Sequence, residues 1–137
     1  MVEFKDKLVL ITGAGSGIGE ALAYQFAQKG TNVLLTGRRR ANLEKVKVEC
    51  EKMGVKGYVC ELDLEQYSSI DSLVEYIDSN GLNPNFIVLN AGISQRALTF
   101  DSDFSVDQKL MNTNYFGSVY LIKKLRHHLI GAPKAHI

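Results

Sequence analysis

Short apolar runs alternate along the chain with longer segments in which apolar residues recur every three or four positions. The apolar runs cover Leu8–Ile11, Val33–Leu35, Val55–Leu62 and Phe86–Leu89. A run without regular polar alternation is typical of a strand that is buried on both faces. These runs therefore predict strands of a parallel sheet.

The segments between and after the runs predict amphipathic helices. The apolar stripes are Ile18, Ala21, Leu22 and Phe26, then Leu43, Val46, Cys50 and Met53, then Ile70, Leu73, Val74 and Ile77. Gly30, Gly54 and Gly81 follow these stripes, which is where glycine commonly ends a helix.

Two helix starts can be predicted from polar residues. The third helix is expected to begin at Ser68 or Ser69, since serine is a good N-cap. A long fourth helix is expected to begin at Ser105, because Ser105 and Gln108 fit a capping box.

This order of strands and helices predicts an α/β fold. We expect a Rossmann-type, doubly wound parallel sheet of about four strands in the order 3-2-1-4, with right-handed crossovers and helices on both faces. Sheets of this type bind ligands beyond the carboxyl ends of their strands. The first such end is Thr12-Gly13, where glycines cluster.

Composition fits one soluble globular domain. The 137 residues are 45% hydrophobic and 23% charged, which are ordinary values for such a domain. The 16 basic and 15 acidic residues give a net charge of +1. Electrostatics therefore give no reason to expect nucleic acid or an anionic membrane surface as a partner.

The cysteines and the N-terminus point to a reducing compartment. Cys50 and Cys60 have neither the spacing of a metal site nor that of a disulfide framework. The stretch Met1–Lys7 lacks the apolar core of a signal peptide, and no apolar run approaches the ~20 residues of a membrane span. We expect a reduced, cytoplasmic protein without a membrane span.

A glycine-rich loop, T-G-A-G-S-G-I-G from Thr12 to Gly19, joins the first strand to the first helix. Helix N-termini carry unpaired N–H groups and a partial positive charge, and glycines let the backbone approach a pyrophosphate closely. We therefore interpret the loop as a nucleotide-binding element rather than a flexible turn. It is not a Walker A loop, since no Lys-Ser/Thr pair follows, and the G-x-G-x-x-G fingerprint would need glycine in place of Ile18.

The spacing that does fit is T-G-x-x-x-G-I-G. Its fixed positions are Thr12, Gly13, Gly17, Ile18 and Gly19, and Gly15 and Ser16 lie between them. In this pattern the chain resembles the short-chain dehydrogenase/reductase family, whose members bind NAD(H) or NADP(H) through this loop. The resemblance covers essentially the whole chain.

Two further motifs match the family in the expected order. Asp63-Leu64 ends the third strand, where the family has an Asp that faces the adenine. Asn90-Ala91-Gly92 ends the fourth strand, where the family has an N-A-G element beside the cofactor ribose. The family usually has a second Asn before this element, and this chain has Leu89. Each motif alone is compatible with an ordinary loop or turn, but their joint occurrence makes chance a poor explanation.

The end of the second strand favours NADP(H) over NAD(H). An NAD-binding unit has an acidic residue there for the ribose 2′-OH, whereas a 2′-phosphate needs an arginine. No acidic residue lies between Glu20 and Glu44, and the strand ends T-G-R-R-R. Because a guanidinium can donate two bonds to a phosphate, Arg38 is the leading candidate and Arg39 the second. The alternative is a solvated helix start, where basic residues are mildly unfavourable.

The resemblance implies a proton relay for hydride transfer. In the family, a Tyr tuned by a Lys is the general acid/base, a Ser orients the substrate oxygen, and an Asn on the fourth helix completes the relay through water. Tuning is needed because a phenol of pKa ~10 exchanges protons poorly at neutral pH. Asn114-Tyr115-Phe116-Gly117 matches the family's N-x-x-G context, so Asn114 is the predicted catalytic residue. The alternative is a satisfied buried asparagine.

Tyr120 and Lys124 have the i, i+4 spacing of a catalytic pair. They lie on the same helix as Asn114, whereas the family's pair lies on the next helix, after a fifth strand that carries the Ser. We therefore interpret them as a packed tyrosine and a solvated lysine. The three histidines, His127, His128 and His136, suggest neither a triad nor a metal site. We expect a surface role for each of them, and no metal is predicted.

Residues 1–137 are accordingly interpreted as the NADP(H)-binding Rossmann portion of a short-chain dehydrogenase/reductase domain, truncated before the fifth strand. The catalytic Ser and Tyr-Lys are expected downstream, this chain alone is expected to be inactive, and the fourth strand is expected to have an open edge. The long helix also has more apolar surface than solvent exposure favours, at Leu110, Phe116, Tyr120, Leu121 and Leu125. In the family this helix commonly packs in a dimer, so we expect a homo-oligomer of the full-length protein.

The leading functional hypothesis is an NADP(H)-dependent oxidoreductase acting on a small-molecule or lipid-like carbonyl or alcohol. The lipid-like class comes from a short similarity of Asn90–Arg96 to family members that reduce lipid ketones. The alternative is a catalytically silent dinucleotide-binding module for redox sensing or assembly. A third possibility is a phosphate-binding structural domain, which would not distinguish NADPH from NADH.

Overall fold

The computed structural model describes all 137 residues and places the four strands in one parallel sheet. The strands are β1 (Leu8–Thr12), β2 (Asn32–Gly37), β3 (Gly57–Glu61) and β4 (Phe86–Val88). Their order is β3-β2-β1-β4, and in the register of the central strand Val9 lies between Val33 and Phe86. The predicted fold class and strand order are confirmed.

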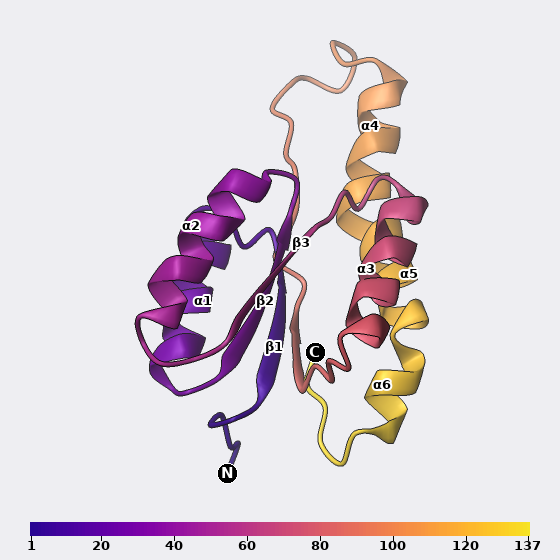
Figure 1. Ribbon diagram of the computed structural model, residues 1–137. Coiled ribbons are helices and arrows are strands. Elements are labelled where there is room, and N and C mark those ends of the chain that lie inside the picture. The colour runs from indigo at the N-terminus through magenta and orange to yellow at the C-terminus, as the bar shows by residue number, and fades with distance from the viewer.

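Helices cover both faces of the sheet (Figure 1). On one face lie α1 (Gly17–Gln28) and α2 (Arg40–Glu51), and on the other lie α3 (Tyr67–Ser79) and α5 (Gly117–Lys124). Helix α4 (Phe104–Met111) extends beyond the sheet and has no buried residue. A π-helical turn, η1 (Asn112–Phe116), joins α4 to α5, and the short helix α6 (Arg126–Gly131) follows. None of the helices combines the length and the hydrophobicity that a membrane crossing requires.

The alternating side chains of β1 divide the core into two clusters. Leu8 and Leu10 pack with residues of α3 and α5, whereas Val9 and Ile11 pack with residues of α1 and α2. All the residues of β1 are buried. Helices on both faces therefore require a strand that is apolar at nearly every position, and this is why the run Leu8–Ile11 lacks polar alternation.

The predicted helix ends are confirmed, but both predicted helix starts are wrong. Gly30, Gly54 and Gly81 follow α1, α2 and α3 with φ values of +77°, +89° and +61°, which glycine adopts without strain. Gln66, rather than Ser68 or Ser69, precedes the first residue of α3. The hydroxyl of Ser69 instead accepts a hydrogen bond from the Asp63 N–H at 2.9 Å.

The fourth helix begins one residue before the predicted start. Its N-cap is Asp103, whose carboxylate accepts from the N–H of Ser105 at 2.8 Å. Hydrogen bonding from Ser105, first from its side chain and then from its backbone N–H, holds the pKa of Asp103 below its usual range, since it stabilises the charged carboxylate. A local acidic cap thus replaces the predicted capping box of Ser105 and Gln108. The third strand is also shorter than the predicted Val55–Leu62.

The predicted long helix is divided by η1 and again at Leu125. Leu121 and Leu125, which we predicted as excess surface, are fully buried in the cluster that contains Leu10. Phe116 remains exposed, with 47% of its surface accessible. The sequence pattern alone did not reveal that this helix packs on the same sheet face as α3.

The free edge of β4 is partly paired, contrary to the prediction. The N–H of Ile87 donates to the carbonyl of His136, and the N–H of His136 donates to the carbonyl of Asn85, both at 2.9 Å. The imidazole of His136 also stacks on the ring of Phe86, with centroids 5.4 Å apart. This parallel bridge places residues from the end of the sequence beside β4, on the side away from β1.

Replacement of Gly117 by Ala should destabilise the fold. A Cβ at this position would collide with the backbone carbonyl of Leu64, where α5 approaches the loop after β3. We expect the free energy of unfolding to fall by about 1–3 kcal/mol, the usual cost of an overpacked site. Urea denaturation measures the loss. Gly131→Ala is the matched control, because nothing lies within 4 Å of its Cβ position; equal stability of the two variants would contradict the close packing.

Candidate functional site

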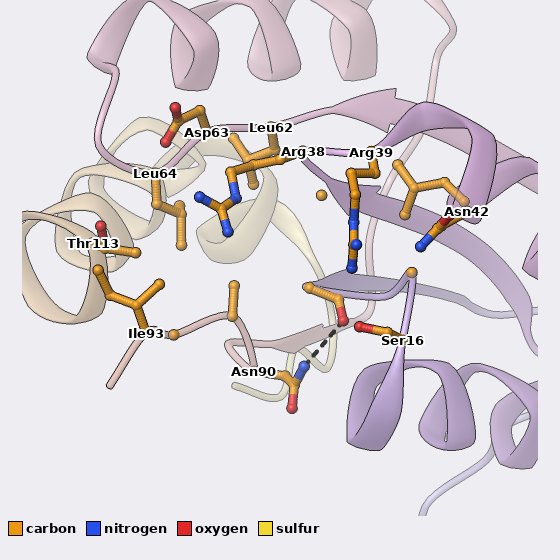
Figure 2. Close-up of a pocket in the computed structure, with 16 residues that line it drawn as sticks. Ser16, Arg38, Arg39, Asn42, Leu62, Asp63, Leu64, Asn90, Ile93 and Thr113 are labelled. Atoms are coloured by element: carbon orange, nitrogen blue, oxygen red, sulfur yellow. Dashed lines mark hydrogen bonds between the residues drawn. The ribbon is translucent and has the colours of Figure 1, made fainter. Parts of the chain in front are cut away.

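One pocket of about 240 Å³ lies at the carboxyl ends of the strands and contains most of the predicted cofactor residues (Figure 2). The predicted residues that line it are Gly13, Gly15, Ser16, Arg38, Arg39, Asp63, Leu64, Asn90, Ala91 and Gly92. They come from four separate loops, one after each strand. The fold therefore brings these loops together at the edge of the sheet where ligands of such folds bind.

Glycine is required in the first loop for steric reasons. Gly13 has a φ of +68°, and a Cβ there would lie 3.0 Å from the Cα of Ala91. A Cβ on Gly19 would collide with the carbonyl of Gly13. The loop therefore folds tightly against the turn after β4, and this packing accounts for two of the glycines in the motif.

The N-terminus of α1 has unsatisfied hydrogen-bond donors beside the pocket. Ser16 is the N-cap residue, but its side chain makes no capping hydrogen bond. The first N–H groups of a helix have no partner within the helix, and α1 has 12 residues with their dipoles aligned. This end of α1 can therefore attract an anion, with the Ser16 hydroxyl available beside it.

Thr12 and Asn90 tie the end of β1 to the turn after β4. The buried hydroxyl of Thr12 accepts from the N–H groups of Asn90 and Ala91, both at 3.0 Å. The amide of Asn90 donates in return to the carbonyls of Thr12 and Gly13, at 3.1 and 3.3 Å, and Figure 2 shows the second of these bonds. Thr12 itself does not line the pocket, so its contribution is to position two of the loops that do.

Two arginines give the pocket a positive end. Arg38 and Arg39 extend from the end of β2 into the pocket (Figure 2). Neither forms an ion pair within the protein, whereas the next residue, Arg40, pairs with Glu44 at 3.5 Å. Among the residues that line the pocket, only Asp63 is acidic. Two exposed guanidinium groups without a carboxylate partner can bind a phosphate in bidentate fashion.

Asp63 is held by its own turn. Its carboxylate accepts from the N–H of Glu65 at 3.0 Å, and its N–H donates to the hydroxyl of Ser69. These bonds fix the loop between β3 and α3, in which Leu62 and Leu64 also line the pocket. Asp63 thus has a structural role in the turn as well as a place at the pocket.

The side chain of Asn114 forms two hydrogen bonds with the segment that follows β4. Its Oδ1 accepts from the N–H of Ile93 and its Nδ2 donates to the carbonyl of the same residue, both at 2.8 Å. Asn114 lies in η1, and π-helical turns inside α-helices are frequent at functional sites. Its side chain is exposed rather than buried, so the buried-asparagine alternative does not describe it. It does not line the pocket, although its neighbours Thr113 and Ile93 do.

Three other predicted residues lie outside the pocket lining. Ile18 points into solvent with 73% of its surface accessible, and Gly17 and Gly19 serve the geometry of the loop. The lining residues Asn42, Leu43, Ile93 and Thr113 were not predicted from the sequence, whereas Gly37 and Leu62 directly precede predicted residues. Asn42 could have been found, because the first turn of α2 follows the arginines directly. A Cβ on Gly15 would lie 3.2 Å from the Cβ of Asn42, so the two residues are neighbours.

Tyr120 and Lys124 lie on the α3 side of the molecule and do not line the pocket. The Tyr120 hydroxyl donates to Asp71 at 3.0 Å, and the Lys124 ammonium contacts the same carboxylate oxygen at 2.9 Å. These partners hold the pKa of Asp71 below its usual range, Lys124 being the larger cause, and Asp71 in turn raises the pKa of Lys124. This contact joins α3 to α5, in agreement with the interpretation as a packed tyrosine and a solvated lysine.

His127 and His128 have a partner that the sequence did not reveal. Both rings lie within hydrogen-bond distance of Asp78, near the end of α3. Hydrogen bonds from the two rings, His127 first, hold the pKa of Asp78 below its usual range. Only 9% of the His128 side chain is exposed, so the expected surface role is wrong for this residue. Asp78 lies about fifty positions earlier in the chain, and no local pattern connects it to the histidines.

The family model described as short chain dehydrogenase matches residues 7–137. A Drosophila melanogaster protein named dehydrogenase/reductase SDR family protein 7-like is 39% identical over 98% of this chain and 43% of its own length. A fatty acyl-CoA reductase of Acinetobacter baylyi is 38% identical over 97% of this chain and 46% of its own length. The chain thus spans less than half of these relatives.

A solved structure shares both the fold and the strand arrangement. The L-sorbose reductase of Gluconobacter frateurii, complexed with NADPH and L-sorbose, superimposes with a TM-score of 0.88 and 25% identity. The match covers 95% of this chain and 51% of the sorbose reductase. The similarity therefore extends over nearly all of the sheet and helices described above.

Replacement of Asn114 by Ala should free the loop after β4. Both bonds from Asn114 to the Ile93 backbone would be lost, so we expect the Ile93 N–H to exchange with solvent faster than in the unmodified protein. Hydrogen exchange followed by NMR measures this directly. Asn112→Ala, in the same π-helical turn, is the control, since both side-chain hydrogen bonds to Ile93 come from Asn114. Unchanged exchange of the Ile93 N–H in Asn114→Ala would show that the two hydrogen bonds from Asn114, here called the Ile93 clamp, are not needed to order the loop.

Proposed function

The chain belongs to the short-chain dehydrogenase/reductase family, and from that premise we propose that it binds NADP(H) for hydride transfer between the nicotinamide and a carbonyl or alcohol carbon. One observation carries the cofactor assignment. The end of β2 presents Arg38 and Arg39 without a carboxylate partner, in a pocket that a glycine loop and a helix N-terminus also line.

The rest of the pocket suits the other parts of the dinucleotide. The glycine loop and the start of α1, where Gly15 and Ser16 face the pocket, would hold the pyrophosphate. Asp63 and Leu64 would hold the adenine, and the turn Asn90–Gly92 would hold the nicotinamide ribose, as the family's motifs suggest. Because the strand order is β3-β2-β1-β4, the adenine end of the cofactor is assigned to the β3 side of the pocket and the nicotinamide end to the β4 side.

The 2′-phosphate is assigned to Arg38, with Arg39 as the second donor. An NAD-specific site would need a carboxylate at the end of β2, where this chain has Gly37. Asn42 lines the same part of the pocket and can donate a further hydrogen bond. The sorbose reductase with the similar fold is an NADPH complex, which is compatible with this choice.

None of the residues that line the pocket is a tyrosine or a lysine, so the family's acid/base pair has no counterpart there. The Tyr120 hydroxyl donates a hydrogen bond to Asp71 and lies away from the pocket, so Tyr120 is not assigned as the general acid. We place the catalytic Ser and Tyr-Lys downstream, as expected for the family. Asn114 then supplies the relay position on η1, next to the loop that enters the pocket at Ile93.

A lipid-like carbonyl compound is the favoured substrate class. Leu98, Phe100 and Phe104 follow the N-A-G turn, and 75%, 99% and 71% of their surfaces are accessible. Exposed apolar side chains on the segment that leaves the pocket at Ile93 favour an apolar substrate. The Acinetobacter relative is named for an acyl-CoA substrate, which is in keeping with this class.

The exposed aromatic residues of η1, Tyr115 and Phe116, support the proposed homo-oligomer.

Replacement of Arg38 by Gln should weaken NADPH binding and leave NADH binding nearly unchanged. A charge-assisted bond contributes ~1.5–3 kcal/mol, so we expect about a 10- to 100-fold increase in the Kd for NADPH. Isothermal titration calorimetry with both cofactors measures the ratio. Arg40→Gln is the matched control, since it removes the same charge from a residue that pairs with Glu44 outside the pocket. An equal loss for both cofactors would contradict the 2′-phosphate assignment.

The intact protein that carries this chain should consume NADPH in the presence of a carbonyl substrate. We expect Asn114→Ala to lower kcat by about 10²–10⁴-fold, the usual range for a lost proton-transfer group, with little change in the Kd for NADPH. Asn112→Ala should retain activity. NADPH absorbance with a panel of short and long-chain carbonyl compounds measures turnover. Tight NADPH binding without turnover of any member would favour the silent dinucleotide-binding module instead.

A further inference from the structure

Three metal-ligating side chains converge on the face of the molecule away from the cofactor pocket. Asp78 lies at the end of α3, and His127 and His128 lie at the start of α6, which Figure 1 shows beside that end of α3. The Nε2 atoms of His127 and His128 lie 3.2 and 2.8 Å from the same carboxylate oxygen of Asp78. All three ligand atoms lie within 4.8 Å of one another.

These distances are close to those between the ligands of a tetrahedral zinc ion. With bonds of ~2.0–2.1 Å, neighbouring ligand atoms of such an ion are ~3.3 Å apart. Small movements of the side chains would bring the two distances to this value, since Asp78 and His127 are both about half exposed. We propose that Asp78, His127 and His128 bind Zn²⁺ with three protein ligands and a fourth position open to water.

The surroundings of His128 favour the tautomer that binds a metal. Its Nε2 faces Asp78, and its Nδ1 lies 3.4 Å from the Oδ1 of Asn83. The side-chain nitrogen of Asn83 donates to the carbonyl oxygen of Gly81 at 3.5 Å. The side-chain oxygen of Asn83 therefore faces the His128 ring. Both ring nitrogens of His128 therefore face oxygen acceptors.

A neutral imidazole has only one proton for these two acceptors. The side chain of His128 is only 9% exposed, so its ring is held in this position by its neighbours. With Zn²⁺ on Nε2, the single proton stays on Nδ1 and points to Asn83. A metal-bound histidine commonly donates its other N–H to such a carbonyl oxygen, which fixes the ring.

The ligand set selects zinc rather than magnesium or calcium. Two imidazoles and one carboxylate suit Zn²⁺, whereas the harder cations take mainly oxygen ligands. The rings of His127 and His128 also lie with their centroids 4.1 Å apart. Both rings present their Nε2 atoms to the same carboxylate oxygen of Asp78.

The ion would attach α6 to the rest of the fold. Helix α6 has 6 residues and none of them is buried, and so short a helix is not stable by itself. Its contacts with Asp78 are side-chain bonds to α3. A bound Zn²⁺ would hold α6 in place and with it the segment that leads to His136 beside β4. This site is independent of the proposed cofactor function.

Zinc binding to the intact, tag-free protein tests the proposal. After removal of metals with a chelator, equilibrium dialysis against Zn²⁺ should give one tightly bound zinc per chain. His127→Gln and Asp78→Asn should each increase the Kd for zinc at least about tenfold, since each removes one of three ligands. The His127 side chain is 59% exposed, so its replacement leaves the core intact. Co²⁺ should give the visible absorption of a tetrahedral complex in the unmodified protein but not in His127→Gln or Asp78→Asn.

Two matched variants control for nonspecific binding. Asp71→Asn removes another exposed carboxylate of α3, and His136→Gln removes the remaining histidine. Both should retain zinc with unchanged affinity. Zinc should also raise the Tm of the unmodified protein and of these controls but not that of His127→Gln, because a ligand stabilises only the state that binds it. Zinc binding that is absent from the unmodified protein, or equal in all the variants, would overturn the proposal.

Discussion

The hydroxyl of Thr12 is the contact on which the cofactor pocket depends. It lies at the end of the central strand, where it accepts two N–H groups from the turn after β4. The amide of Asn90 completes the link by donating to the carbonyls of Thr12 and Gly13. Strand β1 and strand β4 thus end at the same level, and the glycine loop and the N-A-G turn form adjoining walls. Both polar groups are hydrogen-bonded, so their burial is not a large cost.

The pocket is asymmetric in charge because two arginines lack partners. The next residue along the chain, Arg40, pairs with Glu44. Arg38 and Arg39 do not, and they precede the N-terminus of α2, where the helix dipole disfavours a positive charge. A local arrangement that lowers stability without structural compensation is typical of a binding site. A phosphate would supply the missing negative charge.

The opposite side of the molecule is organised by two carboxylates of α3. Asp71 and Asp78 are seven positions apart, two helical turns, and so lie on one face of the helix. Asp71 binds Tyr120 and Lys124 of α5, and Asp78 binds His127 and His128 of α6. The pKa of each carboxylate is lowered. Their contribution to stability is therefore present above the usual carboxyl pKa and is lost as the pH falls through the lowered values.

The sequence by itself determined the order of elements, the sheet and the location of the pocket. Apolar runs, helical stripes and glycines after helices are local patterns, and their periods follow directly from strand and helix geometry. Because parallel strands all end at one edge, the motifs after β1, β2, β3 and β4 had to meet there. The lining residues Arg38, Asp63 and Asn90 could therefore be predicted without coordinates, while their roles toward a cofactor remain proposals.

Only the tertiary structure decided which distant side chains meet. The caps Gln66 and Asp103, the π-helical turn around Asn114 and the clamp on Ile93 depend on which of several competing hydrogen bonds forms in the packed molecule. The cluster of Asp78, His127 and His128 depends on how α6 lies against α3. Such contacts join residues far apart in sequence, and no periodic pattern encodes them. The packing of the helices on the sheet has to exist before these side chains can be brought within bonding distance.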